Sequence, residues 1–322
     1  MKTYKRYMLI MIFGLALGCS EDDVVPSVQN DFLLKSQGPA IVGDTVEFAY
    51  AAATLEGHIQ AMYAKPAIPG GIGTGFDSHA YSVDAVGNEV GIELARPQSE
   101  GESNAALFNV DTNAVTLRYY YVVPESARGL QFSIQFSVET TSGKTTSLAS
   151  ATYNVAKLKI EREVVMTDND KCYFSLARMK AYTEQEVIDQ GIADQIDFRY
   201  IYDALNPDGI PYGHALVSLG TEERYLNGRI IPSSFGTSTS KIEKRAFVND
   251  MQLSEMLPAT FVDDIDLETV DLTQTNDFIL GINTRNSAFV ETSDGRYRGF
   301  LFFKSARSRT LNIGVKLMEM EQ

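Results

Sequence analysis

Five carboxylates crowd into nine residues late in the chain, and their spacing could hold a metal ion. They are Asp263, Asp264, Asp266, Glu268 and Asp271. Because Ca²⁺ takes about six to eight oxygen ligands, a bound calcium ion would relieve their mutual repulsion. Apolar residues between Ile265 and Leu272 interleave with the acids, so an edge strand with a solvated face explains the run equally well. No cofactor is expected, because His58, His79 and His214 stand in no metal-binding spacing.

A second group of residues could recognise a ligand. The segment Asn206–His214 is too rich in Pro and Gly for a core element, and further Tyr and Arg follow it. These residue types are favoured at recognition surfaces. The candidates are Tyr212, His214, Arg224, Tyr225 and Arg229. A plain connecting loop is the alternative, and the absence of Trp weighs against a dedicated glycan-binding module.

Sequence motifs for catalysis are missing. The chain contains no Gly-x-Ser-x-Gly, His-Glu-x-x-His or paired Cys-x-x-Cys pattern. Residues Ser238–Lys241 match Ser-x-x-Lys, but their Gly-, Thr- and Ser-rich surroundings would not build the helical turn that this dyad needs. Cys172 lies in a strand-like stretch and is expected to be a buried, inert thiol. We therefore predict that the protein is not an enzyme; a glycan hydrolase is the least favoured alternative.

The N-terminus indicates secretion and attachment to a membrane. Basic residues precede an apolar core of about ten residues, which is too short to span a bilayer. The core ends at Ala16-Leu17-Gly18-Cys19, which resembles the lipobox of bacterial lipoproteins and implies acylation of Cys19. The next residues are similar to the surface-export signal of Bacteroidota lipoproteins: Ser20, Glu21, Asp22 and Asp23. A solvated acidic tether is the alternative. We expect a signal peptide over residues 1–18, a tether over 19–30, and a lipid anchor in the outer membrane that faces the cell exterior.

The net charge of the chain limits the classes of molecule that it is expected to bind. The formal net charge is −14, and it becomes −17 once residues 1–18, with three basic and no acidic side chains, are removed. Such a chain lacks the clustered Lys and Arg that nucleic acid demands. An acidic chain is also not attracted to anionic lipid, so we expect the acyl chains alone to attach the protein to the membrane.

Residues 31–157 are predicted to form an immunoglobulin-like β-sandwich. Val115–Val123 and Phe132–Val138 alternate apolar and polar residues with a period of two, which is typical of half-buried antiparallel strands. Several more short strands surround them, and hardly any helical period appears. A crossing over 157–163, where we expect weak backbone protection, leads to the second domain.

Residues 158–322 are predicted to form a second, β-rich domain with two short helices. Thr183-Glu184-Gln185-Glu186 fits a capping box, and Gly191 is placed to stop that helix. A second helix is expected over Asp250–Leu257, where Pro258 would end it. In Leu311–Leu317 alternate residues are apolar, which predicts a C-terminal core strand.

Several segments of the second domain resemble a known group. These are Tyr173-Phe174-Ser175, the helix over 183–190, Ile196-Asp197-Phe198 and the run Glu291–Gly299. The pattern is similar to uncharacterised two-domain surface lipoproteins of Bacteroidota, with an immunoglobulin-like domain and a β-rich domain loosely like haemophores of the HmuY type. The resemblance implies a mainly β fold and association with SusC/SusD-type porins that import oligosaccharides or peptides.

Together these features predict a non-enzymatic outer-membrane lipoprotein. The first domain would be a spacer, and the second would bind an oligosaccharide or peptide ligand or dock on an uptake porin. The rival interpretation is a structural or adhesive surface lipoprotein.

Overall fold

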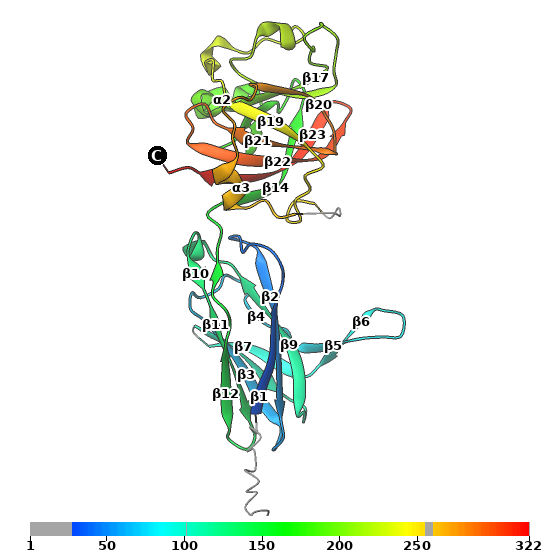
Figure 1. Cartoon of the computed structure of the whole chain (residues 1–322), viewed down its shortest axis with the longest axis vertical. Helices are drawn as coiled ribbons and strands as arrows, with labels where there is room; N and C mark the ends of the chain where they lie inside the picture. Colours follow the sequence, from blue (N-terminus) through cyan, green and yellow to red (C-terminus); the bar gives the residue numbers. More distant parts are fainter. Residues whose placement is uncertain (1–27, 101, 255–259, 322) are drawn as a thin grey trace, which may run out of the picture.

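The computed structural model describes residues 28–100, 102–254 and 260–321, which form two β-rich domains along one axis (Figure 1). The segment with Cys19, Ser20, Glu21, Asp22 and Asp23 lies outside the described residues. The mainly β architecture predicted from the sequence is confirmed. None of the described helices is long and apolar enough to cross a membrane.

The first domain holds thirteen described strands. Their bounds are β1 (Val28–Lys35), β2 (Thr45–Thr54), β3 (Ile59–Pro66), β4 (Gly75–Phe76), β5 (His79–Val83), β6 (Glu89–Glu93), β7 (Ala95–Glu100), β8 (Ser103–Phe108), β9 (Ala114–Val122), β10 (Gln131–Phe132), β11 (Ile134–Thr140), β12 (Thr145–Ala149) and β13 (Tyr153–Asn154). The sheet β1-β2-β9-β4 faces the sheet β12-β11-β3-β8-β7 in a sandwich, while β5 and β6 form a separate hairpin. Period-two side chains fill the sandwich, as in β9, where Leu117, Tyr119 and Tyr121 are fully buried.

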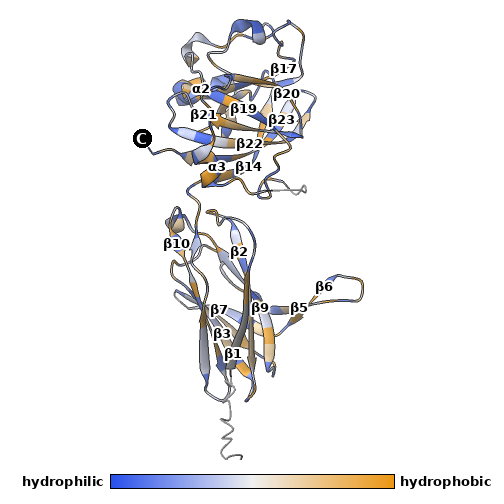
Figure 2. Ribbon diagram, viewed as in Figure 1, coloured by the Kyte–Doolittle hydropathy of each residue, from blue (hydrophilic) through white to orange (hydrophobic). Residues whose placement is uncertain are grey.

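The second domain packs two five-stranded sheets against each other. One has the order β14-β23-β22-β21-β19 and the other β16-β15-β17-β18-β20. The strands are β14 (Lys159–Thr167), β15 (Tyr173–Ser175), β16 (Lys180–Tyr182), β17 (Phe198–Tyr202), β18 (His214–Ser218), β19 (Lys241–Ala246), β20 (Phe278–Ile282), β21 (Asn286–Glu291), β22 (Tyr297–Arg307) and β23 (Thr310–Glu319). Hydrophobic residues gather along these strands and hydrophilic ones in the outer loops (Figure 2).

Two short α-helices are described in this domain, one of them where the sequence predicts it. Helix α2 (Glu184–Gln190) has the predicted capping box between Thr183 and Glu186, and Gly191 ends it with a φ of 62°. The helix predicted over 250–257 is wrong: its described part, residues 250–254, forms a turn. Lys316 accounts for this, because its buried ammonium donates to the Asp250 carboxylate, the Gln252 amide and the Val262 carbonyl, each at 2.7 Å. The second helix is instead α3 (Asp264–Thr269).

The connection between the domains is tightly bound, contrary to the weak protection expected over 157–163. The Asp264 carboxylate accepts the backbone N–H groups of Lys157 and Leu158, at 2.7 and 3.2 Å. Arg128 of the first domain donates to the carbonyls of the same two residues. Ile41 of the first domain is fully buried in an apolar cluster with Leu158 and residues of the second domain. Side-chain bonds and apolar packing therefore join the two domains.

Candidate functional site

A polar cleft of about 440 Å³ lies in the second domain, between the β21–β22 turn and the segment that enters β17. It is lined by Ala177, Asp194, Gln195, Asp197, Ser238, Thr292, Ser293, Asp294, Arg296 and Tyr297. Most of these side chains carry hydrogen-bonding groups, so the cleft offers donors and acceptors to a ligand.

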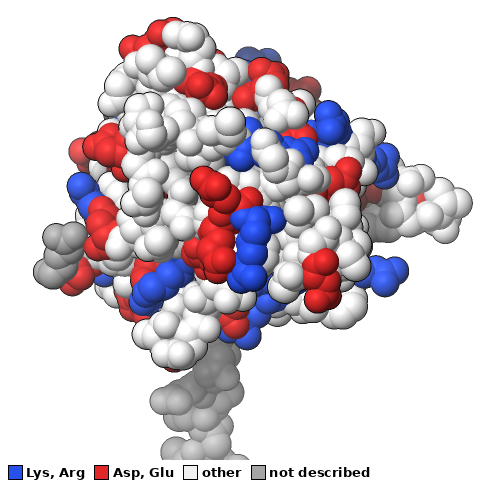
Figure 3. Space-filling view, turned by 90° about the horizontal axis from the view of Figure 1, so that it is seen from above, with Lys and Arg blue, Asp and Glu red and all other residues white. Residues whose placement is uncertain are grey.

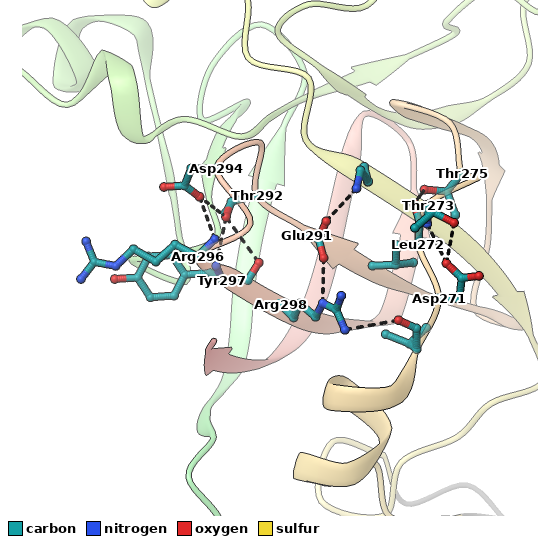
Figure 4. Close-up of polar contacts among 12 residues, drawn as sticks. Asp271, Leu272, Thr273, Thr275, Glu291, Thr292, Asp294, Arg296, Tyr297 and Arg298 are labelled. Atoms are coloured by element: carbon teal, nitrogen blue, oxygen red, sulfur yellow. Dashed lines mark hydrogen bonds and ion pairs between the residues drawn. The ribbon is translucent and has the colours of Figure 1, made fainter. Parts of the chain in front are cut away.

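The β21–β22 turn holds its polar side chains in fixed positions. Asp294 accepts the Thr292 hydroxyl at 2.6 Å and the Arg296 N–H at 3.0 Å, and these bonds hold the pKa of its carboxyl below the usual range. Gly295 has a φ of 69°, which permits the tight reversal. Figure 4 shows Asp294, Arg296 and Tyr297 projecting to one side of the turn, and Glu291 and Arg298 to the other.

Asp197 is a buried carboxylate at the bottom of the cleft. It is 6% exposed and accepts the Leu176 N–H at 2.8 Å and the Ser240 hydroxyl at 3.0 Å. Burial raises its pKa to about 6, and the nearby Asp294 acts in the same direction, while the two hydrogen bonds oppose the rise. The cleft therefore contains two carboxyl groups whose pKa values are displaced in opposite directions.

Arg296 and Tyr297 form the outer wall of the cleft. The guanidinium lies 5.2 Å from the centroid of the Tyr297 ring and donates to the Glu319 carboxylate at 2.7 and 3.0 Å. Tyr297 is half-buried and packs against the main core of the domain. The wall thus combines the Arg296 cation with the face of the Tyr297 ring. Glu319 holds the first in place, and the core of the domain holds the second.

A partly buried ion network supports the turn from below. Glu291 accepts Lys241 from β19 at 2.8 Å and Arg298 from β22 at 2.7 Å (Figure 4). Arg298 also donates to carbonyls at the C-terminal end of α3, among them Leu267 at 3.1 Å. This network joins three strands, β19, β21 and β22, and the helix α3 behind the cleft, so the turn rests on a rigid base.

The Tyr and Arg residues predicted to bind a ligand do not form a common site. Tyr225 is buried and stacks on Phe278, with 4.4 Å between ring centroids. Arg229 pairs with the fully buried Asp168 carboxylate at 2.7 Å. Arg224 pairs at the surface with Glu222 at 2.8 Å. These three side chains serve packing and charge pairing: Tyr225 lies against β20, Arg229 pairs with the turn that follows β14, and Arg224 pairs within its own segment.

Tyr212 and His214 complete that group of predicted residues. Tyr212 is exposed and lines a shallow groove of about 390 Å³ beside β19 and β20. The His214 Nδ1 is hydrogen-bonded to the Tyr200 hydroxyl at 2.7 Å, and burial lowers the pKa of the imidazole. Neither residue lines the polar cleft.

The acidic run from Asp263 to Asp271 is a capped helix, and the edge strand considered for it is wrong. Asp263 and Asp266 form the capping box of α3, and Asp264 binds the interdomain connection. Asp271 accepts the Thr273 N–H and hydroxyl, and Glu268 lies 3.9 Å from Lys157. Within 28–100, 102–254 and 260–321 no group of three potential ligands is arranged to hold a metal ion, so the calcium hypothesis gains no support.

Two further candidates have structural roles. Cys172 is buried, and burial raises the pKa of its thiol. In the Ser238–Lys241 motif, Lys241 is bound to Glu291, while Ser238 lies in the polar cleft within 3.2 Å of the Ser293 hydroxyl. A serine nucleophile activated by Lys241 is therefore not formed.

The cleft was not predicted from the sequence, although signals for it exist. Its turn belongs to the run Glu291–Gly299, and its floor to Ile196-Asp197-Phe198. In the sequence both segments stand out only as structural markers of a resemblance. A turn that carries Asp, Arg and Tyr within four residues, together with a lone Asp between apolar residues, is the signal that points to the cleft.

Comparison with solved structures gives a strong match to a protein of Bacteroidota. A DUF4466 family protein from Parabacteroides merdae is 31% identical, with a TM-score of 0.84 over 92% of this chain and all of the other. The chain belongs to the DUF4466 family. The DUF4466 model matches residues 26–155, and a second domain of unknown function, DUF8576, matches residues 156–320. The cleft of this DUF4466 protein thus lies in its DUF8576 domain.

Two further solved structures are only weakly similar. The fimbrial subunit MyfA of Yersinia enterocolitica is 12% identical, covering 40% of this chain and 98% of its own, with a TM-score of 0.24. The major pilin subunit BcpA of Bacillus cereus is 7% identical, covering 92% of this chain and 68% of its own, with a TM-score of 0.29. No match was found among curated proteins. The relative from Parabacteroides agrees with the predicted origin in Bacteroidota.

Proposed function

We propose that this protein is a non-enzymatic lipoprotein of the outer-membrane surface that binds a polar, saccharide-like ligand in the cleft of its second domain. The proposal rests on the polar cleft, whose lining includes Asp197, Asp294, Arg296 and Tyr297. Carboxylates accept hydrogen bonds from sugar hydroxyls, a guanidinium donates to ring and hydroxyl oxygens, and a tyrosine ring offers a face to C–H groups.

An oligosaccharide fits this cleft better than an extended peptide. Peptide grooves present apolar pockets or an open sheet edge, whereas polar side chains dominate this lining. The end of the molecule formed by the second domain shows acidic and basic side chains interspersed, with no continuous basic surface (Figure 3). That distribution suits a neutral polar ligand, and it does not suit nucleic acid.

The binding proposal is tested by calorimetric titration with a panel of neutral oligosaccharides and peptides. We expect Asp294→Asn and Arg296→Ala to weaken saccharide binding at least about tenfold, because each removes a charge-assisted hydrogen bond. Asp208→Asn is the matched control, since Asp208 is an exposed carboxylate in a loop outside the cleft. Equal affinities in all three variants would assign the ligand to another surface.

A glycoside hydrolase is the second candidate, because carboxyl groups with oppositely displaced pKa values share the cleft. In such enzymes a protonated acid and an ionised carboxylate act on either side of the scissile bond. Release of reducing ends from a bound oligosaccharide, abolished by Asp197→Asn, would favour this function over simple binding.

The location rests on the N-terminal segment, and Cys19 is its critical residue. Cys19→Ala should move the protein from the membrane fraction to the soluble fraction, because the acyl chains are the proposed anchor. Fatty-acid labelling of the wild type but not of the variant checks the modification, and protease treatment of intact cells checks surface exposure. An unlabelled wild type would contradict the lipoprotein assignment.

An uptake role adds a porin partner to this assignment. We propose that the protein is an accessory component of a SusC/SusD-type system that imports the bound ligand. Gentle solubilisation of outer membranes should then co-purify a porin and its lid lipoprotein with this protein. Co-purification with fimbrial subunits instead would favour the structural or adhesive alternative.

A further inference from the structure

A β-hairpin projects sideways from the first domain, and most of its side chains are exposed among the described residues (Figure 1). It consists of β5, β6 and the turn over 84–88 (Figure 1). Four of its apolar side chains are strongly exposed: Val83 at 68%, Val86 at 81%, Val90 at 45% and Ile92 at 59%. We call this hairpin, residues 79–93, the arm. Apolar side chains gathered on one projecting element are unusual for a surface that faces only water.

One face of the arm is fixed to the sandwich. Arg118 of β9 lies 4.2 Å from the centroid of the Tyr81 ring and pairs with Glu89 at 2.5 Å. Tyr81 also donates to the Asp77 carboxylate at 2.8 Å. Tyr81 and Glu89 belong to the same face, because Tyr81 lies opposite Gly91 and Val83 lies opposite Glu89 in the register. These contacts determine the direction in which the arm projects.

The other face of the arm carries no charge. Ala80 lies opposite Ile92, and Ser82 lies opposite Val90, so these four side chains share the face that is turned away from Arg118. Ala80 packs against the sandwich core, whereas the other three are exposed. The arm thus presents an uncharged strip that ends at Val86 in the tip.

The tip is ordered by its own hydrogen bonds. The Asp84 carboxylate accepts the N–H groups of Val86 and Asn88, at 2.9 and 2.8 Å, and Gly87 adopts a φ of 91°. Val86 is therefore held outward by a turn that needs no contact with the rest of the molecule. A preorganised apolar tip loses little conformational entropy when it enters a complementary pocket.

The charges of the arm select the kind of partner. The arm has three acidic residues, Asp84, Glu89 and Glu93, and no Lys or Arg, and only Glu89 is paired with a cation, Arg118 of β9. Pairing of two copies along β6 would place Glu89 and Glu93 against each other, and like charges opposite one another destabilise a sheet. An anionic lipid surface would repel the same acids. A protein groove with an apolar floor and a basic rim complements both the strip and its charges.

We infer that the arm is a docking element that inserts Val86, Val90 and Ile92 into an apolar, basic-rimmed groove of a different protein on the cell surface. This proposal is independent of the ligand cleft, which lies in the other domain. It also gives the first domain a role beyond that of a spacer.

The test places the photo-crosslinking residue p-benzoylphenylalanine singly at position 86, 90 or 92 of the full-length protein in its own cells. Control positions are 55 and 130, where exposed leucines lie in the same domain outside the arm. We expect all three arm positions, and neither control, to give an adduct with one and the same protein, identified by mass spectrometry. Adducts with a second copy or with lipid, or no adduct at all, would overturn the proposal.

The identified partner is then purified and titrated with the full-length protein. We expect Val86→Asp to lower its affinity at least tenfold and Glu93→Lys to weaken the salt dependence of binding, whereas Leu55→Asp changes neither. Val86 is 81% exposed, so the melting temperature of Val86→Asp should equal that of the wild type. Unchanged affinity in Val86→Asp at an unaltered melting temperature would refute docking through the tip.

Discussion

Two buried carboxylates, Asp168 and Asp197, show how differently the same residue type is used in the second domain. Asp168 is fully buried beside Arg229, so its charge is paired. Asp197 has only neutral donors, Leu176 N–H and the Ser240 hydroxyl, and the pKa of its carboxyl rises to about 6. A buried carboxylate without a cationic partner lowers the stability of the folded state. Such carboxylates are typical of functional sites.

The Asp197 carboxyl should make the protein less stable as the pH rises from about 4 to 6. Its folded-state pKa of about 6 exceeds the ordinary value of 3.8, so over this range the folded state binds the proton and the unfolded state does not. Two pH units correspond to about 3 kcal/mol. Urea titrations measure the unfolding free energy of Asp197→Asn minus that of the wild type. We expect this difference to increase by about 3 kcal/mol between pH 4 and pH 7. A flat difference in Asp197→Asn over this range would contradict the raised pKa.

Removing Arg229 should destabilise the fold severely. Arg229→Ala removes the nearer partner of the buried Asp168 carboxylate and leaves only the exposed Arg309, 3.9 Å away, so the loss should approach about 3–5 kcal/mol. Arg224→Ala is the matched control: its pair with Glu222 is exposed, and the loss should be below about 1 kcal/mol. Chemical unfolding of both variants measures the difference. Similar stabilities would show that Arg229 is not the partner of a buried carboxylate.

Among the elements, the strands and α2 could be predicted from the sequence, because their signals are local. The alternation in Val115–Val123 and the capping box at Thr183 depend only on neighbouring residues. Helix α3 has the same kind of box, from Asp263 to Asp266, but the surrounding acids suggested ligands or an edge strand. The turn at residues 250–254 depends on Lys316, which is more than 60 residues away in sequence, and local patterns cannot contain that information.

The cleft shows the same limit at the level of a site. Thr292–Tyr297 could be predicted as a turn, yet Asp194, Ser238 and Asp294 meet only because three separate segments converge. The Tyr and Arg loop was predicted as a site from composition. Composition does not distinguish Tyr212, which is exposed, from Tyr225, which is buried against Phe278.

Calcium should not stabilise the protein through the acidic run. Asp263 and Asp266 already cap α3, and Asp264 binds the Lys157 and Leu158 amides. A ligand raises the melting temperature only if it binds the native state. We expect no shift with millimolar Ca²⁺ in a thermal melt, and EDTA-treated protein is the control. A shift that disappears in Asp264→Asn with Asp266→Asn would contradict this view.

At the scale of the whole molecule, the two domains should resist separation by proteases. The backbone around Lys157 is bonded to Asp264 and Arg128, and Leu158 is fully buried. We expect trypsin to cut slowly at Lys157 and Lys159 in the wild type. Asp264→Ala should cut faster at these sites, because it frees two backbone amides, whereas Asp271→Ala, on the same segment, should not. Fragment mass spectrometry over time measures both rates, and rapid wild-type cleavage there would disprove a bound connection.

The bound connection also determines how the molecule carries mechanical load. The described chain enters the first domain at one end, through β1, and leaves it at the opposite end, toward β14 (Figure 1). A pull between these ends runs parallel to β1, while the hydrogen bonds between β1 and β2 lie across the strands. These bonds are therefore loaded together in shear, and they do not open one at a time as in unzipping. Together with Arg128 and Asp264 at the connection, this geometry makes the sandwich a stalk that transmits tension between the base of the molecule and the domain that carries the cleft.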